Sequence, residues 1–381
     1  MQIRTKLPKV GTTIFSVMSQ LAMQHKAINL GQGFPDFDGP QTLRDALAAA
    51  MNSGKNQYAL MTGVPKLREQ IALKTERLYG RKASADTEIT VTSGATEALF
   101  AAIAAVVHAG EEVIVLDPCY DSYEPAVELC GARAVHVPLR LPDFAVDWAR
   151  VQAAITPKTR MILINSPHNP SGAVLSAGDL DTLAELVRGT EIFVLSDEVY
   201  EHIIFDGQPH QSVLCHAELA SRSFVVSSFG KTYHCTGWKV GYCIAPPQLS
   251  AEFRKVHQYL TFCTFNPAQW AFADMLEADP RHYLDLPQFY QAKRDRFRTL
   301  LAGSKFKLLP VSGAYFQLAD YSAISAKDDL NFCEWLVREA GVAAIPVSAF
   351  YENPPDVKLI RFCFAKSDET LVAAAERLCR L

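Results

Sequence analysis

Apolar residues in the middle of the chain gather into short, nearly unbroken runs. The runs occupy residues 88–91, 112–116, 134–137, 160–164, 191–195, 223–227 and 240–244. Unbroken apolar runs of this length are typical of strands that are buried on both faces of a sheet. Helical patterns, such as residues 96–107 and 177–187, separate several of the runs. The alternation predicts an α/β fold with a largely parallel sheet covered by helices.

The C-terminal third has a different pattern, which predicts a second, smaller α+β domain. Its expected elements are a long helix at 286–301, a pair of short strands within 307–318, a helix at 330–340, a strand at 359–364 and a last helix from Ser367. The glycines and prolines between residues 31 and 40 favour an arm and loop over a separate domain. We therefore expect an N-terminal arm that is part of the small domain (1–42), a large domain (43–283) and a small C-terminal domain (284–381).

Composition limits the class of protein. The chain has 381 residues, and at about 150 residues per domain this length favours two or three domains. Hydrophobic residues make up 49% and charged residues 20%, which excludes disordered, collagen-like and coiled-coil chains. The formal net charge of -4 argues against a nucleic-acid partner.

Cysteine usage and hydropathy indicate the compartment. The nine cysteines are scattered and contain no CxxC motif, so we expect neither a disulfide framework nor a zinc site. The longest apolar stretch, near residues 98–107, falls short of the roughly 20 residues that span a bilayer. His168, His202 and His234 have neighbours unsuited to a ligand set, so no metal is expected. The sequence predicts a soluble cytoplasmic protein without a membrane partner.

A polar segment follows each of three apolar runs, at residues 165–172, 196–200 and 228–231. Ligands of open α/β sheets bind beyond the carboxyl ends of the strands, and parallel strands bring these ends to one edge. We therefore expect an amide, a carboxylate, a phenol, a hydroxyl and a lysine to meet there.

The chemistry of these groups points to an aldehyde-bearing aromatic cofactor. A buried lysine without a partner is costly, so Lys231 is exposed, paired or used covalently as a Schiff base. Asp197 suits a protonated ring nitrogen, and Asn169 and Tyr200 can donate hydrogen bonds to a phenolate oxygen. The SGAT segment at 93–96 precedes a helix and offers backbone amides to a phosphate. These features together describe pyridoxal phosphate.

Three longer motifs carry a resemblance to a known family. They are SSFGKTYHCTGWKVGY at 227–242, HNPSG at 168–172 and SDEVY at 196–200. With them the chain, from Leu7 to Leu381, resembles the fold type I, class I and II aminotransferases. NLGQGFPDF at 29–37 and NQY at 56–58 are similar to the kynurenine aminotransferase / glutamine transaminase K branch, and above all to its bacterial members that act on methionine. Residues 12–15, 61–63 and 256–262 fit those members too.

The resemblance implies a mostly parallel seven-stranded sheet, pyridoxal phosphate as cofactor and a homodimer with shared active sites. Lys231 would be the Schiff-base lysine and would shuttle a proton between the substrate Cα and cofactor C4′. Asp197 would pair with the pyridinium nitrogen, and Tyr200 and Asn169 would hold the phenolate oxygen. The other implied contacts are Tyr120 stacked on the ring; Gly94, Ala95, Thr96, Ser228 and Lys239 on the phosphate; Tyr58 from the neighbouring subunit; and Arg361, Asn169, Gly33 and Phe15 on the substrate.

The implied reaction is a ping-pong transfer of the amino group of methionine, and of other bulky apolar or aromatic amino acids, to a 2-oxo acid. Aspartate aminotransferases use a second arginine for the side-chain carboxylate, and none can be placed here. The aromatic residues Phe15, Phe34, Tyr123 and Phe265 instead favour an apolar or thioether side chain.

Three alternatives stay open at this point. A kynurenine or glutamine aminotransferase would differ in its amino donor. A cysteine-S-conjugate β-lyase on the same scaffold would release pyruvate and ammonia without a 2-oxo acid. A cofactor-holding regulator would show no turnover, although the chain has no basic patch for nucleic acid.

Overall fold

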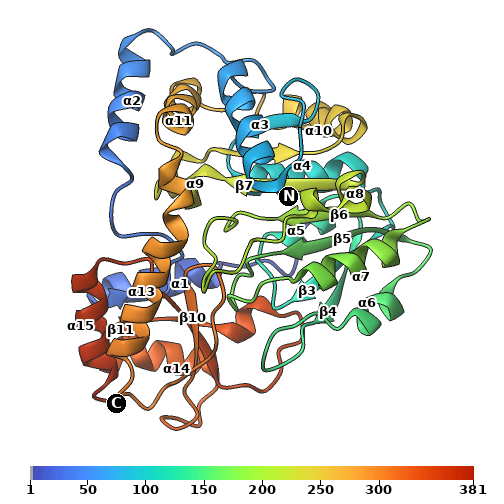
Figure 1. The fold of residues 1–381 in the computed structure, drawn as a ribbon. Coiled ribbons are helices and arrows are strands. Elements are labelled where there is room, and N and C mark those ends of the chain that lie inside the picture. The colour runs from blue at the N-terminus through green and yellow to red at the C-terminus, as the bar shows by residue number, and fades with distance from the viewer. Residues whose placement is uncertain (1–2) are drawn as a thin grey trace.

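The computed structural model describes residues 3–381 and contains a large central sheet and a smaller part beside it (Figure 1). Seven strands form the central sheet in the order β2-β8-β7-β6-β5-β3-β4. Strand β8 runs antiparallel to both of its neighbours, and the other neighbouring strands pair in parallel. The strands are β2 (Ile89–Thr92), β3 (Glu112–Asp117), β4 (Arg133–Pro138), β5 (Thr159–Asn165), β6 (Phe193–Asp197), β7 (Ser223–Ser228) and β8 (Gly241–Ile244). The predicted runs and the parallel character of the sheet are confirmed, with strand ends shifted by at most two residues.

Both faces of the central sheet are buried, which explains the unbroken apolar runs. In β3, Val113 and Val115 pack with helices α4, α5 and α10, whereas Ile114 and Leu116 pack on the other face with α3, α7 and α11. The helices of this part are α2 (Gln41–Asn52), α3 (Pro65–Tyr79), α4 (Ala95–Val106), α5 (Tyr123–Leu129), α6 (Trp148–Ala154), α7 (Ala177–Val187), α8 (Ala217–Ala220), α9 (Phe229–Thr232), α10 (Pro247–Leu260), α11 (Asn266–Ala278) and α12 (Arg281–Leu284).

The smaller part has an antiparallel sheet in the order β12-β13-β10-β9. Its strands and the short pair β1-β11 are β1 (Ile28–Asn29), β9 (Lys307–Leu308), β10 (Phe316–Asp320), β11 (Val342–Ala343), β12 (Ile345–Pro346) and β13 (Leu359–Cys363). Its helices are α13 (Leu286–Leu300), α14 (Asp329–Trp335), a π-helical turn (Leu336–Ala340) and α15 (Asp368–Leu378). The helices and strands expected in this third of the chain are therefore present.

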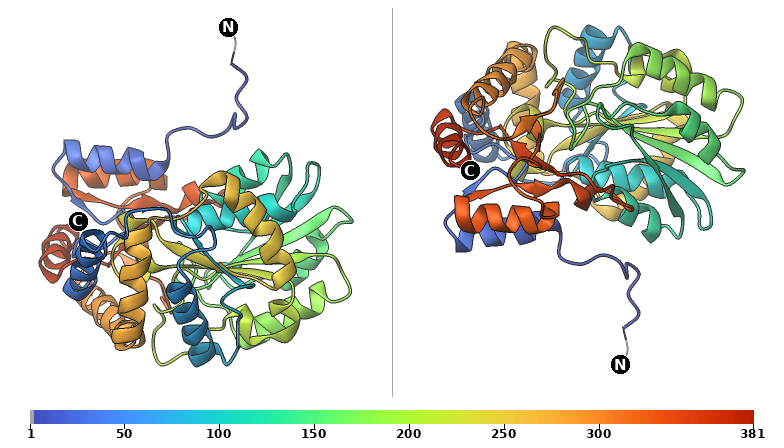
Figure 2. Two further views of the ribbon diagram at one scale, coloured as in Figure 1. Left: turned by 90° about the horizontal axis from the view of Figure 1, so that it is seen from above. Right: turned by 90° about the horizontal axis from the view of Figure 1, so that it is seen from below.

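The N-terminal segment corrects the sequence prediction of an arm and loop. Helix α1 (Ile14–Gln24) and strand β1 lie inside it. Thr13 caps α1 by accepting a hydrogen bond from the Ser16 amide, and Met18 and Ala22 form its buried stripe. These two residues join the same apolar core as α13, α14 and α15, and Figure 2 shows α1 beside α14. The division of the chain at residues 42 and 283 stays a prediction, and residues 1–2 of the expected arm lie outside the described chain.

Two further sequence predictions concern membranes and cysteines. Over residues 3–381, no helix combines the length and apolarity that a membrane crossing requires. All nine cysteines lie in the described chain as free thiols.

The packing of α1 generates the first prediction. Met18 is 1% exposed, whereas Met23 on the same helix is 75% exposed. Met18→Ala should lower the free energy of unfolding by about 2–5 kcal/mol because it leaves a cavity in the core. Met23→Ala is the matched control and should change it by less than about 0.5 kcal/mol. Urea unfolding of both variants measures the difference, and equal effects would show that α1 is not docked on this core.

Candidate active site

The three polar segments meet at one edge of the central sheet, as the parallel strand order requires. Asn165, Asp197 and Ser228 are the last residues of β5, β6 and β7, and Asn165 is the register partner of Asp197. They line a cavity of about 300 Å³. Of the expected site residues, those that line the cavity are Phe15, Gly33, Gly94, Ala95, Thr96, Tyr120, Asn169, Asp197, Tyr200, Ser228, Lys231, Lys239 and Arg361.

Asp197 is a buried carboxylate held in a fixed orientation. Its Oδ2 accepts a hydrogen bond from the Tyr123 hydroxyl at 2.6 Å, and its Oδ1 accepts one from the Val199 amide at 3.3 Å. The Asn165 side chain donates to the Asp197 carbonyl at 2.8 Å. Burial raises the pKa of Asp197 to about 6, against the opposing hydrogen bond from Tyr123. A cationic group in the cavity is the natural partner of this carboxylate.

Lys231 lies on α9, directly after β7, and its amine faces the cavity. Its Nζ donates to the Gly33 carbonyl at 3.1 Å and to the Tyr315 hydroxyl at 3.0 Å. Burial lowers the pKa of Lys231 to about 8, and the positive charges of Arg361 and Lys239 act in the same direction. The neutral, nucleophilic form of this amine is therefore far more populated near neutral pH than that of an ordinary lysine.

One end of the cavity is built for an anion. Helix α4 begins at Ala95, and its N-cap residue Gly94 supplies no side chain to the free amides of the first turn. Gly94 has φ +79°, and a Cβ there would lie 3.2 Å from Cε of Lys239. Only glycine suits both constraints, and the Lys239 ammonium consequently sits over the helix N-terminus. Amides, helix dipole and ammonium together attract a phosphate.

The lining of the cavity also includes a buried guanidinium. Arg361 on β13 is 1% exposed, and it donates to Oδ1 of Asn169 at 2.7 Å and to the Gly31 carbonyl at 2.8 Å. Within residues 3–381 its Nε is buried without a hydrogen-bond partner. Phe316 covers the guanidinium at 4.0 Å, and burial lowers its pKa to about 10. A cation whose partners are neutral oxygens is a receptor for a carboxylate.

Two tyrosines complete the walls of the cavity. Tyr200 is 4% exposed, and burial raises its pKa far above the usual range, so its hydroxyl stays a hydrogen-bond donor. Tyr120 also has a raised pKa because of burial, and its ring meets Tyr123 edge-on at 5.7 Å. Tyr120 thus presents a flat apolar surface beside the Asp197 carboxylate.

One expected contact is not formed within a single chain, and one interpretation of the aromatic residues needs correction. Tyr58 is 82% exposed and does not line the cavity. Phe34 and Phe265 are also exposed, at 44% and 52%, so these two do not form an apolar side-chain pocket in this chain. Tyr123 does line the cavity, but its hydroxyl serves Asp197.

Tyr315 and the role of Tyr123 were not predicted from the sequence. Tyr123 stands three residues after Tyr120 in YDSY, and this spacing at the start of a helix was the available signal for a shared site. Asn165 was part of a predicted polar segment. Tyr315 comes from a distant strand region, and nothing in its sequence neighbourhood indicates Lys231.

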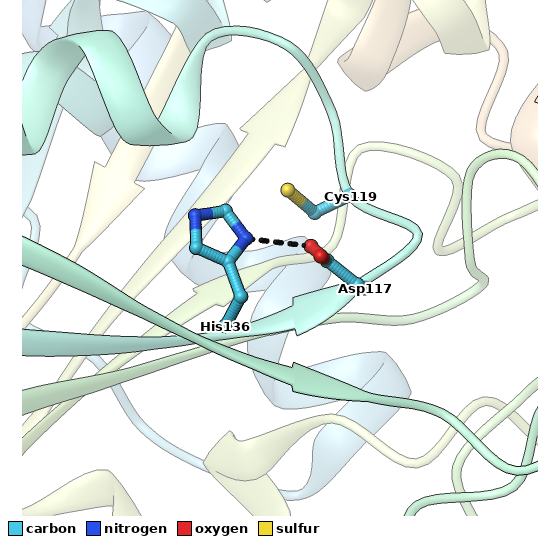
Figure 3. A group of neighbouring side chains, drawn as sticks. All are labelled: Asp117, Cys119 and His136. Atoms are coloured by element: carbon cyan, nitrogen blue, oxygen red, sulfur yellow. Dashed lines mark hydrogen bonds and ion pairs between the residues drawn. The ribbon is translucent and has the colours of Figure 1, made fainter. Parts of the chain in front are cut away.

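Asp117, Cys119 and His136 form a polar cluster (Figure 3), and the first two of them come just before Tyr120 in the chain. The side-chain atoms of Asp117, Cys119 and His136 that could bind a metal ion lie within 4.8 Å of one another. Both carboxylate oxygens of Asp117 are already bonded, one to His136 Nδ1 at 2.8 Å and one to the Glu352 amide at 3.1 Å. The cluster therefore ties β3 and β4 to the smaller part of the protein. The expectation that no metal binds stays a prediction.

Comparisons with known proteins agree with this geometry. The family profile described as aminotransferase class I and II matches residues 25–378. The chain is 58% identical over 378 residues to the methionine aminotransferase of Escherichia coli K12, covering 99% of this chain and 98% of the relative. It is 34% identical to mouse kynurenine–oxoglutarate transaminase 1, covering 95% and 93% of the two chains.

A solved structure is equally similar. The crystal structure of YbdL from Escherichia coli, to which a methionine aminotransferase function has been assigned, superimposes with a TM-score of 0.98. The two chains are 57% identical, and the match covers 100% of each. The likeness therefore includes both the central sheet and the smaller part of the fold.

The lowered pKa of Lys231 generates the second prediction. Its amine attacks an aldehyde only when neutral, so the rate at which cofactor-free protein captures pyridoxal phosphate should rise with pH and level off above a midpoint of about 8. Absorbance spectroscopy across the pH range measures the rate, and Lys231→Ala is the control that removes this phase. A midpoint near the ordinary value of 10.5 would contradict the enclosed, electropositive setting of the amine.

Proposed function

The chain belongs to the class I and II aminotransferase family, and from this premise we propose that it transfers the amino group of methionine, and of other bulky apolar or aromatic amino acids, to a 2-oxo acid. One observation carries the proposal. The Lys231 amine and the Arg361 guanidinium, whose hydrogen-bond partners are neutral, line the same cavity. An amino acid offers an α-carboxylate to the guanidinium while its Cα lies near the amine.

The residues of the cavity fit pyridoxal phosphate, the cofactor of this family. The uncapped start of α4, with Lys239 above Gly94, suits the phosphate. The buried Asp197 suits the ring nitrogen, and Tyr200 is a protonated phenol suited to the phenolate oxygen. Lys231 suits the aldehyde. We propose these roles, together with stacking by Tyr120, for the residues of this chain.

When bound, pyridoxal phosphate supplies an electron-withdrawing ring that stabilises negative charge at the substrate Cα and carries the amino group between the two halves of a ping-pong reaction. Asp197, whose carboxylate is fixed by the Tyr123 hydroxyl, would keep a proton on the ring nitrogen. Arg361 binds the α-carboxylate and can use its unpartnered Nε to do so. Lys231, with its lowered pKa, takes the proton from Cα as a general base.

The lining of the cavity supports a donor without a charged side chain. The basic residues among its described lining are Lys231, Lys239 and Arg361, and each has a proposed role that occupies it. None remains for a side-chain carboxylate. Phe15 and Phe316 lie on the guanidinium at 5.3 and 4.0 Å and offer apolar surface next to the α-carboxylate position. A thioether packs well against such aromatic faces.

The proposed roles of methionine as amino donor and of Lys231 as general base give the third prediction. Cofactor-loaded protein should change its visible spectrum when methionine is added without a 2-oxo acid, because the first half-reaction needs no acceptor. Lys231→Ala should still bind the cofactor but lose at least about 10³-fold in turnover, since the general base is gone. The exposed Lys255→Ala is the matched control and should keep full activity.

Several results would overturn the proposal. Substantial transamination by Lys231→Ala would show that Lys231 is not the general base. Faster turnover of kynurenine than of methionine would show that kynurenine is the preferred amino donor. Release of pyruvate and ammonia from a cysteine S-conjugate, as the main reaction and without a 2-oxo acid, would identify a β-lyase. A spectrum unchanged by any amino acid would favour a regulator.

We also propose that the enzyme is a homodimer in which Tyr58 reaches the phosphate of the neighbouring subunit. Tyr58 and Phe262 form an exposed aromatic patch, in which their rings meet edge-on at 5.2 Å. Leu60, Tyr259 and Phe265 are exposed as well. The patch adjoins the phosphate end of the cavity, since Ser93 and Thr264 form a hydrogen bond at 3.3 Å. A contiguous aromatic patch of this kind favours association with another chain.

Subunit mixing gives the fourth prediction. Tyr58→Ala and Lys231→Ala homodimers should each be defective. A mixed dimer places an intact Lys231 opposite the intact Tyr58 of its partner in one of its two sites, so mixing should restore activity. Activity after unfolding and refolding the mixture, with the mass from light scattering, measures this. A monomeric active enzyme, or no restoration, would contradict the shared site.

The free cysteines support a further part of the proposal, a cytoplasmic location. All nine are thiols, four of them buried, which suits a reducing compartment.

A further inference from the structure

Three groups form a closed hydrogen-bonded triangle at the Lys231 amine. Nζ of Lys231 donates to the Gly33 carbonyl at 3.1 Å and to the Tyr315 hydroxyl at 3.0 Å. The Tyr315 hydroxyl in turn donates to the same Gly33 carbonyl at 2.7 Å. Tyr315 has a single proton, and Gly33 receives it, so the Tyr315 oxygen meets Lys231 as an acceptor. The amine thus has two acceptors on one side.

This arrangement fixes the direction in which the lone pair of the Lys231 amine points. A neutral amine has two N–H groups and one lone pair, and both N–H groups are bonded to Tyr315 and Gly33. The lone pair therefore points away from these partners, toward the cavity that Lys231 lines. After protonation the new N–H takes the same direction. Without moving, the Lys231 amine can therefore act as a base before protonation and as an acid after it, at the same place in the cavity.

Tyr315 is held firmly enough to serve as the docking point. It is fully buried, and its ring packs edge-on against Tyr200 at 5.1 Å and Phe316 at 5.0 Å. Its carbonyl accepts a hydrogen bond from the Phe364 amide at 3.0 Å. Burial, and after it the neighbouring Tyr200, holds the pKa of Tyr315 well above its usual range. The hydroxyl therefore keeps its proton.

Gly33 can approach only because it lacks a side chain. A Cβ on Gly33 would lie 3.1 Å from the Phe316 ring, closer than ordinary packing allows without displacement of that ring. The carbonyl of Gly33 is thereby set beside Tyr315 by steric fit.

We propose that Tyr315 is a positioning residue of the transamination reaction, which with the Gly33 carbonyl docks the free Lys231 amine and aims its lone pair at the substrate Cα. The inference rests on the proposed function, because only a lysine that is free of the cofactor needs a docking point. Tyr315 is not among the residues that line the cavity, and it acts through Lys231.

Tyr315→Phe gives the fifth prediction, because it keeps the ring and removes the acceptor. The half-reaction with methionine should slow by about tenfold to a hundredfold, since a misaimed base transfers protons poorly, while KM changes less than about twofold. The pH midpoint for capture of pyridoxal phosphate by the cofactor-free protein should fall, because the lost acceptor favoured the ammonium form. The matched control is Tyr290→Phe, whose hydroxyl bonds to His234 at 3.0 Å in the same aromatic cluster, and it should leave both values unchanged.

The two readouts separate the possible outcomes. An unchanged midpoint together with an unchanged half-reaction would overturn the positioning role. A lower melting temperature with rate and KM altered together, and no shift of the midpoint, would show a structural role and overturn it as well. If wild-type protein converts no amino acid, the proposed function fails, whereas the capture midpoint still tests the contact between Tyr315 and Lys231.

Discussion

The buried guanidinium of Arg361 is the constraint on which the site depends. A cation removed from water requires compensation, and here neutral oxygens and aromatic faces provide it. These partners come from all parts of the chain, with Gly31 from the N-terminal segment, Asn169 from the loop after β5 and Phe316 from the smaller sheet. The contacts of the Arg361 guanidinium therefore hold the N-terminal segment, the central sheet and the C-terminal part around a single cavity.

The same enclosure acts on an acid and a base in opposite directions. Burial raises the pKa of Asp197 from 3.8 to about 6 and lowers that of Lys231 from 10.5 to about 8. The difference between the two groups shrinks from nearly seven units to about two, which makes proton exchange inside the cavity far less costly than in water. Rigid hydrogen bonds from Tyr123 and to Tyr315 keep the groups apart, so they do not collapse into a simple ion pair.

Much of this was predictable from the sequence, because strand runs that are buried on both faces leave a strong apolar signal and parallel strands must end at one edge. Asp197 and Lys231 follow from that logic. Helix α1 was missed because its apolar stripe is short and glycine-rich sequence follows it. Tyr315 was missed because its contact with Lys231 spans 84 residues and depends on how two sheets pack, which no local pattern records. Tyr58 does not reach the cavity of its own chain, so its role stays a prediction.

The N-terminal segment contributes to the site through its backbone. Gly31 and Gly33 give carbonyl oxygens to Arg361 and Lys231, while neither position has room for a side chain. The groups that bind charge are thus independent of which side chains stand between and after these glycines. The Gln32 side chain, which stands between the two glycines, donates instead to the Phe15 carbonyl and the Ser19 hydroxyl of helix α1. Within three consecutive residues, 31–33, the segment thus binds two charged groups through its backbone and helix α1 through a side chain.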